Sequence, residues 1–146
     1  SSKAIENHAV LFIKELIPRL QEHGYSTSPV FLVKHGRVAI GDPIAELSCA
    51  RMAAVLIGER PGLSSPDSMG IYFTYQARPG KTDAERNCIS NIHSNGLSYQ
   101  QAVEKLLFLI READRLKLSG VNLKDETVAI ENGTAPKAPH KNFLLE

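Results

Sequence analysis

Short apolar runs that alternate with helix-like stretches constrain the fold of this chain more than any other feature. Residues 3–23 repeat apolar side chains every three or four positions, which is typical of an amphipathic helix. Residues 29–35 and 53–57 contain continuous apolar runs, and runs of this length predict strands that are covered on both faces. A third strand is expected over 71–76, which is rich in aromatic and β-branched residues, and the longest helix over 98–118.

The remaining segments complete a layered α/β pattern. Residues 37–40 predict a short strand, and 42–49 a helix that opens with an aspartate cap and a proline. Residues 82–92 predict a short helix, because Thr82 and Glu85 have the spacing of a capping box. This order of elements predicts a Rossmann-like α/β domain with a mostly parallel sheet flanked by helices. We expect that domain to occupy residues 1–120, with 121–146 forming a C-terminal extension.

Composition narrows the class of protein. The chain has 146 residues, enough for one domain with a sizeable core, and a formal net charge of +1, which argues against nucleic acid or an anionic membrane as partner. Its apolar runs are too short to span a bilayer, and its first residues lack a secretory signal pattern. Two cysteines without metal-site spacing predict reduced thiols in a cytoplasmic protein, a single disulfide between them being the alternative.

The stretch IGERPGLSSPDSMG follows the predicted strand over 53–57. Ligands of α/β sheets bind outside the carboxyl ends of strands, so this turn is a candidate pocket wall in which Glu59 accepts hydrogen bonds and Arg60 binds an anion. The alternative is a surface turn with a local pair between these two side chains. Three serines in the stretch could cradle a phosphate or simply supply loop polarity. These serines are Ser64, Ser65 and Ser68. The sequence contains no GxGxxG, P-loop or GxSxG motif.

Cys88 and His93 raise a second question, because a thiol beside an imidazole can act as a nucleophile. The alternative is a small, half-buried thiol that packs and does no chemistry. His35, at the end of a predicted strand, is either a ligand or a histidine with satisfied hydrogen bonds. The carboxylates are scattered and show no metal-ligand spacing.

Four blocks carry a resemblance to a known family: HGRVAIGDPIAE, VLIGERPGLSSPDSMGIYFTY, DAERNCISNI and KLSGVNLKDE. In this order and spacing, the chain resembles the C-terminal portion of the small (light) subunit of ethanolamine ammonia-lyase. The resemblance implies a carbon–nitrogen lyase that depends on adenosylcobalamin, converts ethanolamine to acetaldehyde and ammonia by a radical mechanism, and is active only with a large subunit. It also implies that the large subunit holds most of the ethanolamine site, and that the enzyme is cytoplasmic, within a bacterial microcompartment.

The resemblance further implies three cobalamin-binding positions, and each suits that ligand chemically. Val38 offers an apolar surface to the corrin rim, Glu59 accepts hydrogen bonds from amide or hydroxyl groups, and Cys88 is a small, soft side chain suited to packing. None of the three is expected to be a catalytic residue or a metal ligand. The competing hypothesis is a stand-alone α/β module that binds a nucleotide or another small molecule without catalysis.

Overall fold

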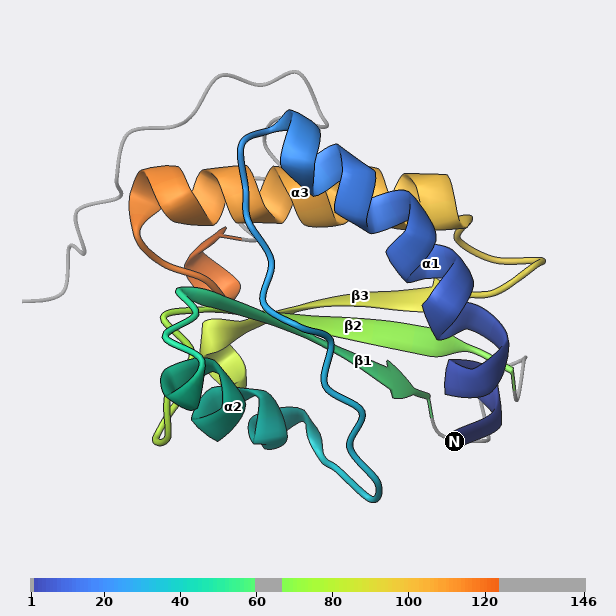
Figure 1. Cartoon of the computed structure of the whole chain (residues 1–146), viewed down its shortest axis with the longest axis horizontal. Helices are drawn as coiled ribbons and strands as arrows, with labels where there is room; N and C mark the ends of the chain where they lie inside the picture. Colours follow the sequence, from blue (N-terminus) through green and yellow to red (C-terminus); the bar gives the residue numbers. More distant parts are fainter. Residues whose placement is uncertain (1, 60–66, 124–146) are drawn as a thin grey trace, which may run out of the picture.

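A three-stranded sheet with helices on both faces forms the fold of the residues that the structure, a computed structural model, describes, namely 2–59 and 67–123. Two long helices lie on one side of the sheet and a short helix lies on the other (Figure 1). The elements in chain order are α1 (Ser2–Glu22), the 3-10 helix η1 (Val38–Ile40), α2 (Gly41–Leu47), β1 (Met52–Gly58), β2 (Met69–Tyr75), the 3-10 helix η2 (Asp83–Glu85), β3 (Arg86–Ile92) and α3 (Tyr99–Leu116).

The sheet is antiparallel throughout, with strand order β1-β2-β3. The prediction of a mostly parallel, Rossmann-like sheet was therefore wrong. Parallel neighbours need a crossover of a dozen or more residues, and the chain returns from β1 to β2 over 59–68 and from β2 to β3 over 76–85. The strand β1, predicted to be covered on both faces, is only half-buried, whereas β2 is covered on both faces by helices and a buried ion pair.

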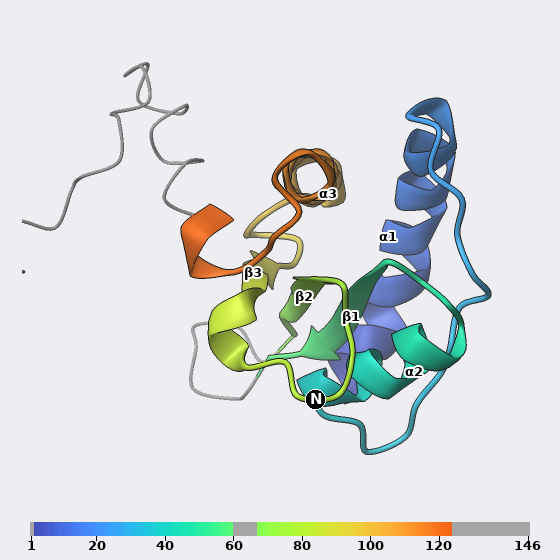
Figure 2. The same cartoon turned by 90° about the vertical axis from the view of Figure 1, so that its left-hand side faces the viewer.

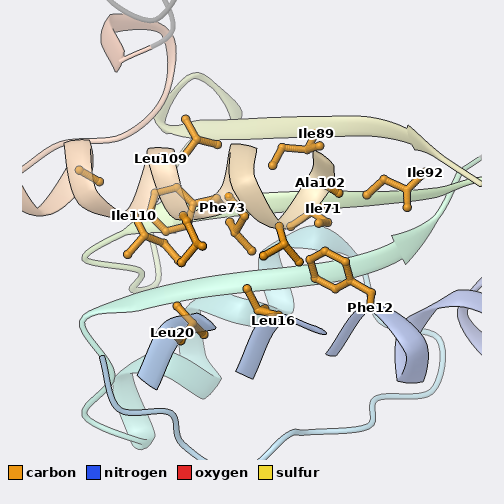
Figure 3. Packing of buried hydrophobic residues seen from close by; sticks show 14 of the residues in the cluster. Phe12, Leu16, Leu20, Ile71, Phe73, Ile89, Ile92, Ala102, Leu109 and Ile110 are labelled. Carbon is orange, nitrogen blue, oxygen red and sulfur yellow. The ribbon is translucent and has the colours of Figure 1, made fainter. Parts of the chain in front are cut away.

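The hydrophobic core lies between the sheet and the two long helices (Figure 3). Alternate residues of β2, such as Ile71 and Phe73, point to this side and meet Phe12 of α1 and Leu106 of α3. Each of these four side chains is almost completely buried, and burial of a side chain of this size contributes about 1.5–3 kcal/mol. The 3.6-residue periodicity that predicted both helices is thus the stripe that faces the sheet.

The short helix α2 packs closely against the opposite face of the sheet. A Cβ atom added at Gly41 would lie 2.6 Å from Cγ2 of Val55, so the glycine allows the helix to approach β1. The next residue, Asp42, is buried and binds the Arg86 guanidinium of β3. The predicted helix is confirmed as α2, but Asp42 is not its cap: it lies inside the first turn, where it forms the ion pair, and Ile40 is the N-cap residue.

The segment 82–92 folds differently from its prediction. Its capping box forms, since the Glu85 carboxylate accepts hydrogen bonds from the backbone N–H and the hydroxyl of Thr82. However, it caps only the single turn η2, after which the chain extends into β3. Residues 86–92 alternate in burial enough to pack as an edge strand beside β2, so tertiary pairing overrides the local helix signal.

Residues 29–40 also differ from their predictions. The stretch 37–40, predicted as a strand, forms η1, and 29–35 has no regular secondary structure. Its apolar side chains are exposed: Val30 at 59%, Phe31 at 50% and Leu32 at 92%. A strand needs a neighbour to satisfy its backbone groups, and among the described residues this segment has none.

The segment that follows α3 is fastened to the sheet. The Asn87 side chain donates to the carbonyl oxygen of Gly120 at 2.9 Å and accepts the Gly120 N–H at 2.7 Å. Gly120 has a φ of 96°, and a Cβ atom there would lie 2.0 Å from the Ala84 carbonyl oxygen. Three residues later, Leu123 is fully buried in the core. Most of the predicted extension, from residue 124 onward, lies outside the described residues.

Candidate functional site

The carboxylate of Glu59 spans the end of the sheet. Glu59 directly follows β1, and its backbone N–H donates to the Ser68 carbonyl oxygen at 2.9 Å. The Ser68 hydroxyl donates to the carboxylate, and the Asn91 N–H lies 3.3 and 3.2 Å from its two oxygens. A Cβ atom at Gly70 would lie 3.3 Å from Oε1, so the side chain crosses β2 directly above this glycine. Glu59 therefore connects the ends of all three strands.

Tyr72 and Cys88 lie on the same face of the sheet, opposite each other on β2 and β3. Gly70 and Tyr72 are two positions apart in one strand, so Glu59 reaches over the face that carries both side chains. The nearby Cys88 raises the pKa of Tyr72 most, followed by burial and by a hydrogen bond with the Cys88 side chain, and Glu59 adds to the effect. The shift therefore couples the Tyr72 hydroxyl to the Cys88 side chain across the two strands.

We refer to Glu59, Ser68, Tyr72 and Cys88 as the sheet-end cluster. The structure thus brings together two of the three predicted site residues, Glu59 and Cys88, and adds Tyr72 and the supporting role of Ser68. Cys88 is exposed and forms no disulfide with Cys49. The cluster combines an anionic acceptor, a phenol and a soft thiol at one end of the sheet.

Val38, the third predicted residue, comes from a different element. It is half-buried in η1, which leads directly into α2. The first turn of α2 packs on the face that carries the cluster, because Asp42 binds Arg86 and Arg86 donates to Thr74, two positions from Tyr72. Val38 therefore lies on the same side of the sheet as Glu59 and Cys88.

The other sequence hypotheses have mixed outcomes. Arg60, Ser64 and Ser65 lie outside the described residues. Ser68 is 1% exposed, and its hydroxyl serves Glu59, so it supports a carboxylate and offers nothing to a phosphate. The His93 ring is used within its own turn: Nε2 lies 2.8 Å from Asn91 Oδ1, and Nδ1 accepts the Asn95 N–H at 3.3 Å. Both nitrogens are occupied, which argues against His93 as a base for Cys88.

A large groove lies elsewhere on the molecule. It has a volume of about 1320 Å³ and runs between α1, residues 24–37, α2 and β1. Its lining includes none of the predicted site residues Val38, Glu59 and Cys88. The groove is thus separate from the sheet-end cluster, in which Cys88 is exposed, Glu59 and Tyr72 are half-buried and Ser68 is buried.

Two further classes of site find no support in the described parts of the chain. Within residues 2–59 and 67–123, no three His, Cys, Asp or Glu side chains are grouped so that they could hold a metal ion. Over the same residues, every helix is too short or too polar to cross a membrane.

Comparisons with known proteins point to one family. Residues 1–124 match the family model described as ethanolamine ammonia-lyase light chain (EutC). The chain is 54% identical to an ethanolamine ammonia-lyase small subunit from Azotobacter vinelandii over 145 residues, which are 99% of this chain and 53% of the relative. A Pseudomonas paraeruginosa relative with the same description is 55% identical over 99% of this chain and 53% of its own length. A Xanthomonas campestris relative is 53% identical, with 99% and 54% covered. The chain therefore spans about half the length of the curated relatives it matches.

Proposed function

Because the chain belongs to the ethanolamine ammonia-lyase light chain (EutC) family, we propose that it forms one wall of an adenosylcobalamin site at the interface with a large catalytic subunit. The complete enzyme would convert ethanolamine to acetaldehyde and ammonia, with ethanolamine held mainly by the large subunit. The proposal includes a cytoplasmic location within a bacterial microcompartment, which rests on the family relationship alone.

The observation that carries the proposal is the convergence of Glu59 and Cys88 around Tyr72. The two residues belong to the GERPG and RNCIS blocks, which are distant in sequence, and they meet on one face only because β3 pairs with β2. Cobalamin presents an apolar corrin rim with amide side chains. A partly exposed face with a carboxylate acceptor, an aromatic ring and a small thiol suits such a ligand.

The hydrogen-bonding capacity of Glu59 fits this role. A carboxylate offers about four lone-pair sites, and here the Ser68 hydroxyl and the Asn91 N–H use part of them. A carboxylate at this position is the kind of acceptor that an amide N–H or a hydroxyl of the cofactor requires. The protein donors also fix the orientation of the carboxylate before a ligand arrives, which reduces the entropy lost on binding.

Tyr72 and Cys88 provide the adjoining surface. Tyr72 contributes a half-buried aromatic ring whose hydroxyl is hydrogen-bonded with the Cys88 side chain, and Cys88 contributes a small contact. Val38, on the same side of the sheet, offers an apolar contact. When bound, adenosylcobalamin supplies the radical chemistry that removes a hydrogen atom from the substrate. The chain's own residues bind and orient the cofactor and exclude water from its edge.

A cobalamin titration followed by visible absorbance tests the proposal, with this chain alone and mixed with a large subunit, and with ethanolamine turnover assayed in the same samples. We expect binding and turnover only in the mixture. Glu59→Gln should weaken cobalamin binding about tenfold or more, since a hydrogen bond to a charged group contributes about 1.5–3 kcal/mol. Tyr72→Phe and Cys88→Ala should weaken it by smaller factors.

Two substitutions serve as matched controls. Glu15→Gln removes an exposed carboxylate from α1, on the opposite side of the sheet, and Cys49→Ala removes the other exposed thiol. Both should leave cobalamin affinity unchanged. Normal binding and turnover by a complex that carries Glu59→Ala and Cys88→Ala together would refute the site. Binding of a nucleotide by the isolated chain would instead favour the stand-alone module.

A further inference from the structure

The outer edge of β1 is unpaired within the described residues, because β1 pairs only with β2. The Gln76 N–H donates to the Arg51 carbonyl oxygen at 2.7 Å, and the Glu59 N–H donates to Ser68, so both ends of β1 bond toward β2 at odd-numbered residues. Backbone groups alternate in direction along a strand. The N–H and C=O groups at the even positions therefore point outward; these are Met52, Ala54, Leu56 and Gly58.

The groove of about 1320 Å³ lies alongside this free edge. All of β1 contributes to its lining, as do the apolar side of α1 and residues 24–37. On its far side, the segment that contains Val30, Phe31 and Leu32 presents apolar side chains that are 50–92% exposed. Figure 2 shows this segment, coloured blue to cyan, passing outside both α1 and α2. The groove thus has apolar walls and a row of backbone donors and acceptors along one side.

A groove with these properties suits a β-strand better than a small polar ligand. An added strand would satisfy the outward backbone groups of β1 and lie about 4.7–4.9 Å from it. Its side chains would meet α1 on one face of the sheet and α2 on the other, and its outer edge would face residues 30–33. Proteins usually cover or blunt a free edge of this length, and an uncovered apolar patch beside it marks an interaction site.

The occupant is identified by the length of the family members. The chain accounts for only 53% of the Azotobacter vinelandii relative, so about as much polypeptide again lies outside the matched part. We propose that one apolar β-strand from this other half of the small subunit occupies the groove and pairs with the outer edge of β1. The groove is thereby an internal seam of the complete subunit, separate from the cobalamin surface.

Residue-resolved amide hydrogen exchange tests this pairing without cofactor or large subunit. The samples are this chain alone and a fusion that joins it to the remaining half of the Azotobacter vinelandii subunit. In the fusion, the amides of Ala54 and Leu56 should exchange on the order of 100-fold more slowly than in the chain alone. The amides of Val55 and Ile57, which face β2, are internal controls and should be protected in both samples.

A pair of substitutions gives a second readout. Leu32 and Leu47 are 92% and 86% exposed, and only Leu32 lines the groove. Leu32→Asp should lower the Tm of the fusion and leave that of the chain alone unchanged, whereas Leu47→Asp should change neither. Equal exchange at Ala54 and Leu56 in both samples would overturn the proposal. Protection in the chain alone that grows with protein concentration would also overturn it, because a second copy would then occupy the edge.

Discussion

Arg86 of β3 and Asp42 of α2 form a buried, bidentate ion pair, with Nη1 2.8 Å from Oδ1 and Nη2 2.6 Å from Oδ2. Their side chains are only 3% and 4% exposed. Arg86 also donates to the Thr74 hydroxyl and to the Lys81 carbonyl oxygen. The hydrogen bond to Asp42 is the main cause of a raised Arg86 pKa, so the guanidinium stays charged. The pair fastens the helix that follows Val38 to the face that carries Cys88.

Removing one partner of this pair should be costly. Asp42→Ala leaves the Arg86 charge buried and uncompensated, and we expect a loss of about 3–5 kcal/mol in the free energy of unfolding, measured with urea. Glu46→Ala, which removes an exposed carboxylate from the same helix, should cost less than about 0.5 kcal/mol. In a double-mutant cycle, Arg86→Met should cost far less when Asp42 is already alanine. Additive effects would mean that the pair is not coupled.

The capping box should make the free energy of unfolding depend on pH in the acidic range. Hydrogen bonds from the Lys81 side chain, and then from Thr82, lower the pKa of Glu85 from 4.5 to about 2. Since the folded-state pKa is the lower one, the stabilising contribution is present above pH 4.5 and is lost as pH falls through about 2. Glu85→Gln should reduce the change in the urea unfolding midpoint between pH 4.5 and about 2. Lys81→Met removes the hydrogen bond that lowers the Glu85 pKa most, so it should narrow the pH range over which stability is lost. If both variants keep the wild-type dependence of the urea midpoint on pH, this assignment is contradicted.

The interaction between Tyr72 and Cys88 can be followed by titration. Because Cys88 is the largest cause of the raised Tyr72 pKa, Cys88→Ala should lower that pKa toward its ordinary value. The tyrosine ring signals in NMR spectra at alkaline pH measure the shift, and Tyr72→Phe assigns them. Cys49→Ala is the matched control and should leave the Tyr72 titration unchanged. An identical titration in Cys88→Ala would show that the two side chains do not interact.

Alanine substitutions at Gly120 and Gly80 distinguish the cost of a steric collision from the cost of backbone strain. Both have positive φ, 96° and 100°, but a Cβ atom at Gly120 would lie 2.0 Å from the Ala84 carbonyl oxygen, while nothing lies within 4 Å at Gly80. Gly80→Ala should cost about 1–2 kcal/mol from left-handed strain alone. Gly120→Ala should cost more than about 4 kcal/mol in urea unfolding, because the backbone must also move. Equal costs would exclude the collision.

Periodicity and length predicted the helices well, but the strand arrangement depends on features that composition does not contain. The apolar faces of α1 and α3 follow from residue spacing over several turns. Continuous apolar runs predict burial on both faces without specifying what covers them, and in β2 a buried Arg86 and Asp42 supply part of that cover. The capping box at Thr82 was real, yet a local cap cannot reveal that β2 offers the following residues a pairing partner.

The candidate site shows the same division. The family resemblance pointed to Val38, Glu59 and Cys88. Tyr72 was not predicted as a site residue, because it lies between Ile71 and Phe73 in a strand whose composition is typical of the core. Its link to Cys88 depends on the register between β2 and β3, which local sequence does not encode. Alternation within the strand was the one available signal, because it places Tyr72 on the face opposite its two apolar neighbours.

The two hydrogen bonds between Asn87 and Gly120 bear on what a match to the family's sequence blocks means. The RNCISNI and KLSGVNLKDE blocks carry the resemblance to the family. These hydrogen bonds join one block to the other, and Gly120 has no room for a side chain. Selection on such positions would preserve architecture whether or not a cofactor is bound. A match to both blocks therefore reports that this architecture is present, whereas Glu59 and Tyr72 lie outside these two blocks and bear separately on the proposed cofactor site.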